Sequence, residues 1–158
     1  MVIWIKIMKV RRKIINWGFL IFWMGVIFYM SNQPANISDN HSFKVISILE
    51  NLNIDVNGVF GELANFIIRK CAHYFEYMIL GFFMLNVVTM YYVFNVSSII
   101  SIIFVFLYAC SDEFHQLFVS GRQGSFRDVI IDTCGGLTFI LIYILFKKIR
   151  KKYFGNID

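Results

Sequence analysis

Two short stretches hold most of the side chains in this chain that could do chemistry. The first runs from Arg69 to Tyr77 and includes arginine, lysine, histidine and glutamate. The second runs from Ser111 to Gly136 and holds four of the ten carboxylates and one of the three histidines. Both stretches adjoin strongly apolar sequence, where ionisable groups are costly and therefore point to function. We expect the functional site to be built from these two stretches.

The residue types in the two stretches fit two kinds of task. Histidine and carboxylate side chains can transfer protons to and from a bound substrate, and we assign six candidate catalytic residues: His73, Glu76, Asp112, Glu113, His115 and Asp128. Arginine binds carboxylate or phosphate groups through two parallel hydrogen bonds, and Arg122 lies between two glycines. The candidate binding residues are Arg69, Lys70, Gln116, Arg122 and Asp132.

The histidines and carboxylates could instead hold a metal ion. Dinuclear carboxylate proteins build such sites from pairs three residues apart on facing helices. The chain has two pairs with this spacing and two further aspartates: His73 with Glu76, Asp112 with His115, and Asp128 or Asp132. We nevertheless predict no metal and no other cofactor, because Arg69 and Arg122 would repel a cation. We expect these arginines to pair with the carboxylates, giving a charge-balanced pocket for an anionic head group.

The composition indicates a membrane protein. The 158-residue chain is 58% hydrophobic and only 16% charged, which is too apolar for an ordinary soluble domain. Its net charge of +5 comes largely from basic clusters near the two ends, within residues 6–13 and 147–152. Basic clusters beside long apolar runs are typical of the cytoplasmic ends of membrane helices. We therefore expect a lipid bilayer, and no nucleic acid, as a partner.

The apolar runs predict an all-α fold in a single domain covering residues 1–158. Four segments are long enough to span a bilayer, at about residues 14–30, 72–94, 98–118 and 128–146. Two shorter segments, at 42–52 and 59–68, have apolar residues at helical spacing and are predicted to be amphipathic helices. We expect a tight turn at Asn95–Ser98 and a glycine-containing loop from Ser120 to Arg127.

Four spans place both termini on one side, and the basic ends predict that this side is the cytoplasm. Nine of the ten acidic residues then lie on the outer side. Helical spacing groups the polar residues into three stripes: Arg69 with His73 and Glu76, Asp112 with His115 and Gln116, and Asp128 with Asp132. We expect these stripes to meet in one pocket on the outer face, with Gly135 and Gly136 allowing close helix packing.

These motifs resemble those of the VanZ-like family of bacterial membrane proteins. The resemblance rests on three segments, from Ser31 to Pro34, from Arg69 to Gly81 and from Asp112 to Gly135, including Gly121-Arg122-x-Gly124-Ser125. It implies a location in the bacterial cell membrane and a role in the cell envelope. The founding members are associated with teicoplanin resistance, so the implied partners are a lipid-linked envelope precursor or a lipoglycopeptide.

Three classes of function remain open from the sequence. The pocket could catalyse acid–base chemistry on a lipid-linked substrate, with arginines holding a phosphate. It could instead bind an envelope lipid or a lipid-tailed antibiotic without chemistry. An ion path is the third class, and polar residues confined to the outer half argue against it. Asp112→Asn and His115→Gln separate the first two classes, because they change proton chemistry while preserving side-chain size.

Overall fold

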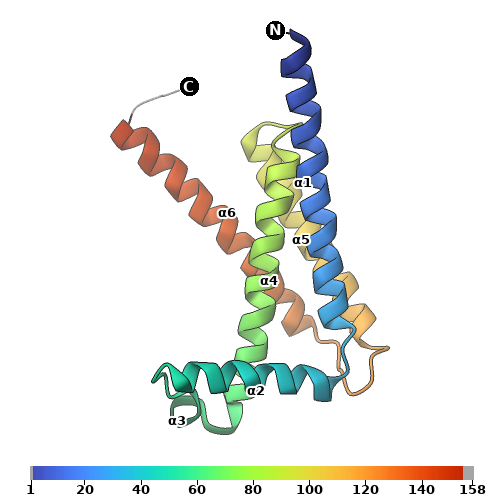
Figure 1. The fold of residues 1–158 in the computed structure, drawn as a ribbon, viewed down its shortest axis with the longest axis vertical. Coiled ribbons are helices and arrows are strands. Elements are labelled where there is room, and N and C mark those ends of the chain that lie inside the picture. The colour runs from blue at the N-terminus through green and yellow to red at the C-terminus, as the bar shows by residue number, and fades with distance from the viewer. Residues whose placement is uncertain (1, 155–158) are drawn as a thin grey trace.

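The structure, a computed structural model, describes residues 2–154, and all its regular elements over that range are helices (Figure 1). Four helices in it are long and apolar enough to cross a membrane, which confirms the predicted all-α, four-span architecture. The elements are α1 (Val2–Ser31), α2 (Ala35–Asn51), α3 (Val56–Phe60), the 3-10 helix η1 (Gly61–Leu63), α4 (Ala64–Val88), α5 (Phe94–Gln116) and α6 (Phe126–Phe154).

Helices α1 and α6 extend beyond the predicted spans at both ends. Helices α4 and α5 begin earlier than predicted, but α4 ends at Val88 instead of 94 and α5 ends at Gln116 instead of 118. The basic N-terminal segment is part of α1, and the basic segment after residue 146 continues α6. The predicted tight turn at Asn95–Ser98 was wrong, because the chain turns at residues 89–93. Ser97 and Ser98 lie in the first turns of α5, where their hydroxyl groups donate to the carbonyls of Val93 and Phe94. Serine satisfied in this way is compatible with a helix.

The two predicted amphipathic segments have different outcomes. The first lies within α2, a 17-residue helix that starts directly after Pro34 and runs across one end of the bundle (Figure 1). The second, 59–68, was wrong as a separate helix. It is divided between the end of α3, η1 and the start of α4, and Gly61 breaks it with a φ of 54°. Glycine tolerates this left-handed conformation, whereas other residues rarely adopt it.

Helix α4 is the centre of the bundle and contacts α1, α2, α5 and α6. It approaches α6 closely through glycines, as the sequence predicted. A Cβ atom on Gly81 would lie 3.0 Å from the backbone of Gly136, and one on Gly135 would overlap the carbonyl of Tyr74. Small residues at such crossings allow backbone-to-backbone contact in membrane bundles. This crossing fixes the starts of α4 and α6 next to each other.

Side-chain hydrogen bonds reinforce the contacts between helices. Trp23 donates to the carbonyl of Glu76 at 2.9 Å, which joins α1 to α4. Tyr74 donates to the Thr138 hydroxyl at 2.6 Å and joins α4 to α6. Large apolar side chains of α1, α5 and α6 remain exposed, as expected for helices surrounded by lipid. The free end of α1 and the far end of α6 lie at the end of the bundle opposite α2 (Figure 1).

Candidate functional site

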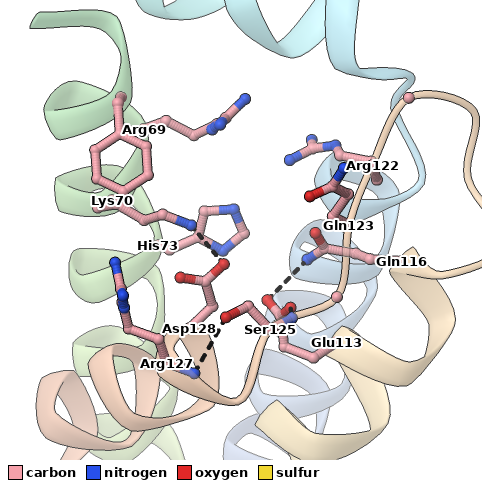
Figure 2. Close-up of a pocket in the computed structure, with 13 residues that line it drawn as sticks. Arg69, Lys70, His73, Glu113, Gln116, Arg122, Gln123, Ser125, Arg127 and Asp128 are labelled. Atoms are coloured by element: carbon pink, nitrogen blue, oxygen red, sulfur yellow. Dashed lines mark hydrogen bonds and ion pairs between the residues drawn. The ribbon is translucent and has the colours of Figure 1, made fainter. Parts of the chain in front are cut away.

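A cavity of about 410 Å³ lies at the α2 end of the bundle. Its lining comes from three helices and one loop: Phe66, Arg69, Lys70 and His73 of α4, Glu113 and Gln116 of α5, residues 121–125, and Arg127 and Asp128 of α6. Figure 2 shows the cationic groups of Arg69 and Arg122 facing each other across this space, from α4 and from the loop. The two polar stretches of the sequence therefore meet in one place.

Two of the four basic residues in the lining are paired with carboxylates. Lys70 Nζ lies 2.5 Å from an Asp128 oxygen, and both side chains are mostly buried. Arg69 forms an ion pair with Asp39 of α2 at 2.9 Å. The first pair ties α4 to α6, and the second ties α4 to α2. These contacts hold the three helices together around the cavity mouth.

Arg122 lies in the loop between α5 and α6 and is half-buried. Its Nε donates to the backbone carbonyl of Gln33 at 3.1 Å, but it forms no ion pair within residues 2–154. The expectation that Arg122 pairs with a carboxylate was therefore wrong. Burial and the neighbouring Arg69 lower the pKa of Arg122, while Asp39 opposes this effect. The surroundings thus disfavour the positive charge, and a bound anion would relieve that cost.

Glu113 and Gln116 form a buried hydrogen-bonded group at the end of α5. One Glu113 oxygen accepts the backbone N–H of Ser125 at 2.8 Å, and the other accepts Gln116 Nε2 at 3.3 Å. A carboxylate that accepts a backbone N–H makes a strong, charge-assisted hydrogen bond. Glu113 therefore positions the loop that carries Arg122 immediately before α6 begins.

His73, Asp112 and Asp132 meet on the side of the cavity that faces the middle of the bundle, and each comes from a different helix. Each can offer one ligand atom, and these atoms lie within 4.8 Å of one another. Asp132 is fully buried and Asp112 is 4% exposed. Asp112 accepts the Ser31 hydroxyl at 2.7 Å and Gln116 Nε2 at 3.3 Å. His73 Nδ1 lies 3.9 Å from Asp132 Oδ1, too far for a hydrogen bond.

Four predicted site residues do not line the main cavity: Asp112 and Asp132, described above, and Glu76 and His115. Glu76 lines a smaller adjoining space of about 140 Å³, which shares Arg69, His73 and Arg122 with the main one. His115 lines neither space. Its ring lies against Phe28 of α1, with the ring centres 4.6 Å apart.

Several residues of the site were not among the predicted site residues. Asp39 pairs with Arg69, and His41 lines the smaller space. Ser31 and Gln33, at and just beyond the end of α1, contact Asp112 and Arg122. The motif from Ser31 to Pro34 was the available signal for the last two. It connects α1 to α2, and the structure explains its polar residues by these contacts.

The fold and site define a multi-pass helical membrane protein with a polar cavity at one end of its bundle. A family model described as VanZ/LLP1 matches residues 16–147. The match covers most of the chain, including every element that lines the cavity, and the chain belongs to this family. Neither a curated protein nor a solved structure matches the chain.

Proposed function

We propose that this VanZ-family protein binds the anionic group of a lipid-linked envelope component in the main cavity. By binding that component it lowers susceptibility to teicoplanin-type lipoglycopeptides. The cavity faces the outside of the cell, and both termini are cytoplasmic. The family supplies the envelope context, and the lining of the cavity supplies the ligand chemistry.

The observation that carries this proposal is the half-buried Arg122 without an ion-pair partner in the described chain. The lining has four basic residues against two acidic ones, Glu113 and Asp128. Asp128 is paired with Lys70, and Glu113 accepts hydrogen bonds from the protein. A phosphate or carboxylate would complete the hydrogen bonds of the Arg122 guanidinium. The cavity lies at one end of the spanning helices, where a lipid head group can reach it.

The test of the resistance role is expression in a sensitive Gram-positive host. We expect the wild-type chain to raise the inhibitory concentration of teicoplanin-type lipoglycopeptides and Arg122→Gln to lose this effect. Lys44→Gln is the matched control, because it removes one positive charge from an exposed position on α2 that does not line the cavity. Equal inhibitory concentrations with wild type and with empty vector, at equal membrane levels, would refute the role.

The orientation has its own test. Reporter domains fused after Tyr153 and inserted at Asn57 should report the cytoplasm and the outside, respectively. The reason is the clustering of basic residues at the ends of α1 and α6 away from α2. A reporter after Tyr153 that is active outside the cell would place the cavity in the cytoplasm and exclude direct contact with an extracellular antibiotic.

Acid–base catalysis on the same lipid-linked ligand is a second candidate function. The observation in its favour is that His73 lines the cavity with the buried carboxylate of Asp132 behind it. Asp112→Asn would separate the two functions, because it preserves size while removing a proton-accepting group. A non-catalytic site should keep its effect on inhibitory concentration in this variant. An enzyme should lose turnover of the lipid-linked ligand while retaining binding.

A further inference from the structure

We propose that His73, Asp112 and Asp132 bind one divalent transition-metal cation, on the side of the cavity that faces the middle of the bundle. The proposal goes beyond anion binding by the cavity and does not depend on it. The three residues come from α4, α5 and α6, and their ligand atoms lie within 4.8 Å of one another. No other group of three metal-ligating side chains this close occurs in the part of the chain that the structure describes.

Atoms without hydrogen-bond partners point to a ligand at this position. Both carboxylate oxygens of Asp132 are buried and have no hydrogen-bond partner among residues 2–154. The same holds for Nδ1 of His73. Buried polar atoms are nearly always satisfied, and an exception calls for an explanation such as a bound ion. Three such atoms on two adjacent side chains are an arrangement that a cation would satisfy.

The charges of the two aspartates also indicate a bound cation. Asp112 and Asp132 are buried carboxylates, and neither has an arginine or lysine partner within ion-pair distance in the described chain. Buried charges are usually paired or coordinated to metal ions. One divalent cation would neutralise both carboxylates.

The nearby basic residues do not exclude a cation here. Repulsion by Arg69 was one reason to expect no metal from the sequence. In the structure Arg69 is paired with Asp39, and Lys70 is paired with Asp128. Each of these pairs has no net charge. Arg122 remains without an ion pair, but its Nε is directed to the carbonyl of Gln33.

The geometry fits a small cation after a modest closure. Zinc bonds of about 2.0–2.2 Å in a tetrahedral site place ligand atoms about 3.4 Å apart. His73 Nδ1 and Asp132 Oδ1 are 3.9 Å apart, and the three ligand atoms lie within 4.8 Å of one another, so the side chains must rotate inward to reach zinc-bonding distances. Three protein ligands leave a fourth position open, which is the arrangement of catalytic rather than structural zinc sites. His73 also lines the cavity, so the open position would be reachable from it.

One imidazole with two carboxylates is a donor set that suits zinc or manganese, and it suits both better than calcium, which prefers six to eight oxygens. Ser31 donates to Asp112 at 2.7 Å and would orient this ligand. Loss of such a supporting hydrogen bond typically weakens metal affinity about 10–100-fold. Ser31→Ala should therefore bind the metal more weakly than wild type while retaining one site.

The test is metal binding by the full-length chain, purified in detergent and stripped with a chelator. Titration with Zn²⁺ and separately with Mn²⁺ is followed by calorimetry, and elemental analysis is done after removal of free metal. We expect one equivalent of at least one of these metals in wild type. Asp132→Asn and His73→Gln should abolish stoichiometric binding, and Ca²⁺ should not replace it. Glu62→Gln is the control variant, because it removes an acidic charge from an exposed position that lines neither cavity.

Circular dichroism and gel-filtration profiles must show that each variant is folded. Asp132→Asn removes a buried charge, so loss of metal without loss of helix content is the expected pattern. Two results would overturn the proposal. In one, folded wild type binds neither Zn²⁺ nor Mn²⁺ stoichiometrically, which would mean that protons satisfy the buried carboxylates. In the other, Asp132→Asn and His73→Gln bind the metal as tightly as wild type and Glu62→Gln do.

Discussion

Replacing Arg122 by glutamine tests whether this arginine binds a ligand or instead stabilises the fold. If Arg122 neutralised a buried carboxylate, its removal would destabilise the protein by about 3–5 kcal/mol. In the structure its Nε donates to one backbone carbonyl and it has no carboxylate partner within the described residues. Loss of one such hydrogen bond costs about 0.5–1.5 kcal/mol. We therefore expect Arg122→Gln to lower the free energy of unfolding by about 1 kcal/mol.

The same substitution should have a larger effect on anion binding. A hydrogen bond to a charged group contributes about 1.5–3 kcal/mol, which corresponds to a factor of about 10–150 in the dissociation constant. The half-buried position of Arg122 favours the upper part of this range, because water competes less there than on an open surface. Arg122→Gln should thus affect the affinity for the ligand more than it affects the fold.

The assay uses full-length protein in lipid nanodiscs, with a polyprenyl phosphate as the anionic probe and the corresponding polyprenol as the uncharged reference. Binding is measured by calorimetry, and stability is measured by denaturant unfolding in detergent. Lys44→Gln, which changes the net charge equally, should bind as wild type does. The reasoning is refuted if Arg122→Gln binds the phosphate with wild-type affinity, or if it loses about 3 kcal/mol or more of stability.

Two further predictions concern packing and pairing. Gly135→Ala should destabilise the protein by about 1–3 kcal/mol, because its methyl group would overlap the Tyr74 carbonyl. Gly18→Ala, at an exposed position with no neighbouring atom within 4 Å, should instead be neutral or stabilising in the same unfolding assay. A double-mutant cycle of Lys70→Met and Asp128→Asn should give a coupling energy of about 0.5–3 kcal/mol, and additive effects would show that this pair contributes nothing.

The sequence predicts those features of the fold that depend on local pattern. Apolar runs predicted the four spans, and the even number of spans predicted that the start of α1 and the end of α6 lie at the same end of the bundle (Figure 1). Glycine content gave the close contact between α4 and α6. The turn before α5 was misplaced because polar residues were taken to interrupt the helix, whereas Ser97 and Ser98 satisfy their hydroxyl groups on its own carbonyls.

Helical phase explains why the predicted stripe of Asp112, His115 and Gln116 was right for two of its residues and wrong for His115. Asp112 and Gln116, four residues apart, share the inward face of α5 and are both buried. His115 is rotated about 60° from Asp112 around a helix axis with 3.6 residues per turn. That rotation directs it to Phe28 of α1 instead. The stripe was therefore predicted as a unit, although only part of it faces the cavity.

The contacts of α2 and of the end of α1 could not be derived from local pattern. Asp39 reaches Arg69 across 30 residues, and Ser31 reaches Asp112 across 81 residues. The first contact depends on how α2 crosses the end of the bundle (Figure 1). The second depends on how α1 packs against α5. The short connection at 32–34 fixes that crossing, and it carries no charge that would have marked it as part of a site.

The proposed cation site and the proposed anion site share His73 and should therefore be coupled. A divalent cation bound by His73, Asp112 and Asp132 would neutralise two carboxylates near the cavity and make its potential more positive. An anion in the cavity should then bind more tightly when Zn²⁺ or Mn²⁺ is present. Coupling between sites is reciprocal, so the anion must strengthen metal binding by the same factor, typically about 5–150-fold.

Phosphate titrations with and without metal, and metal titrations with and without phosphate, measure both affinities. Asp132→Asn should abolish the metal dependence while leaving phosphate binding at Arg122 intact, and equal phosphate affinities with and without bound metal would show that the sites act independently.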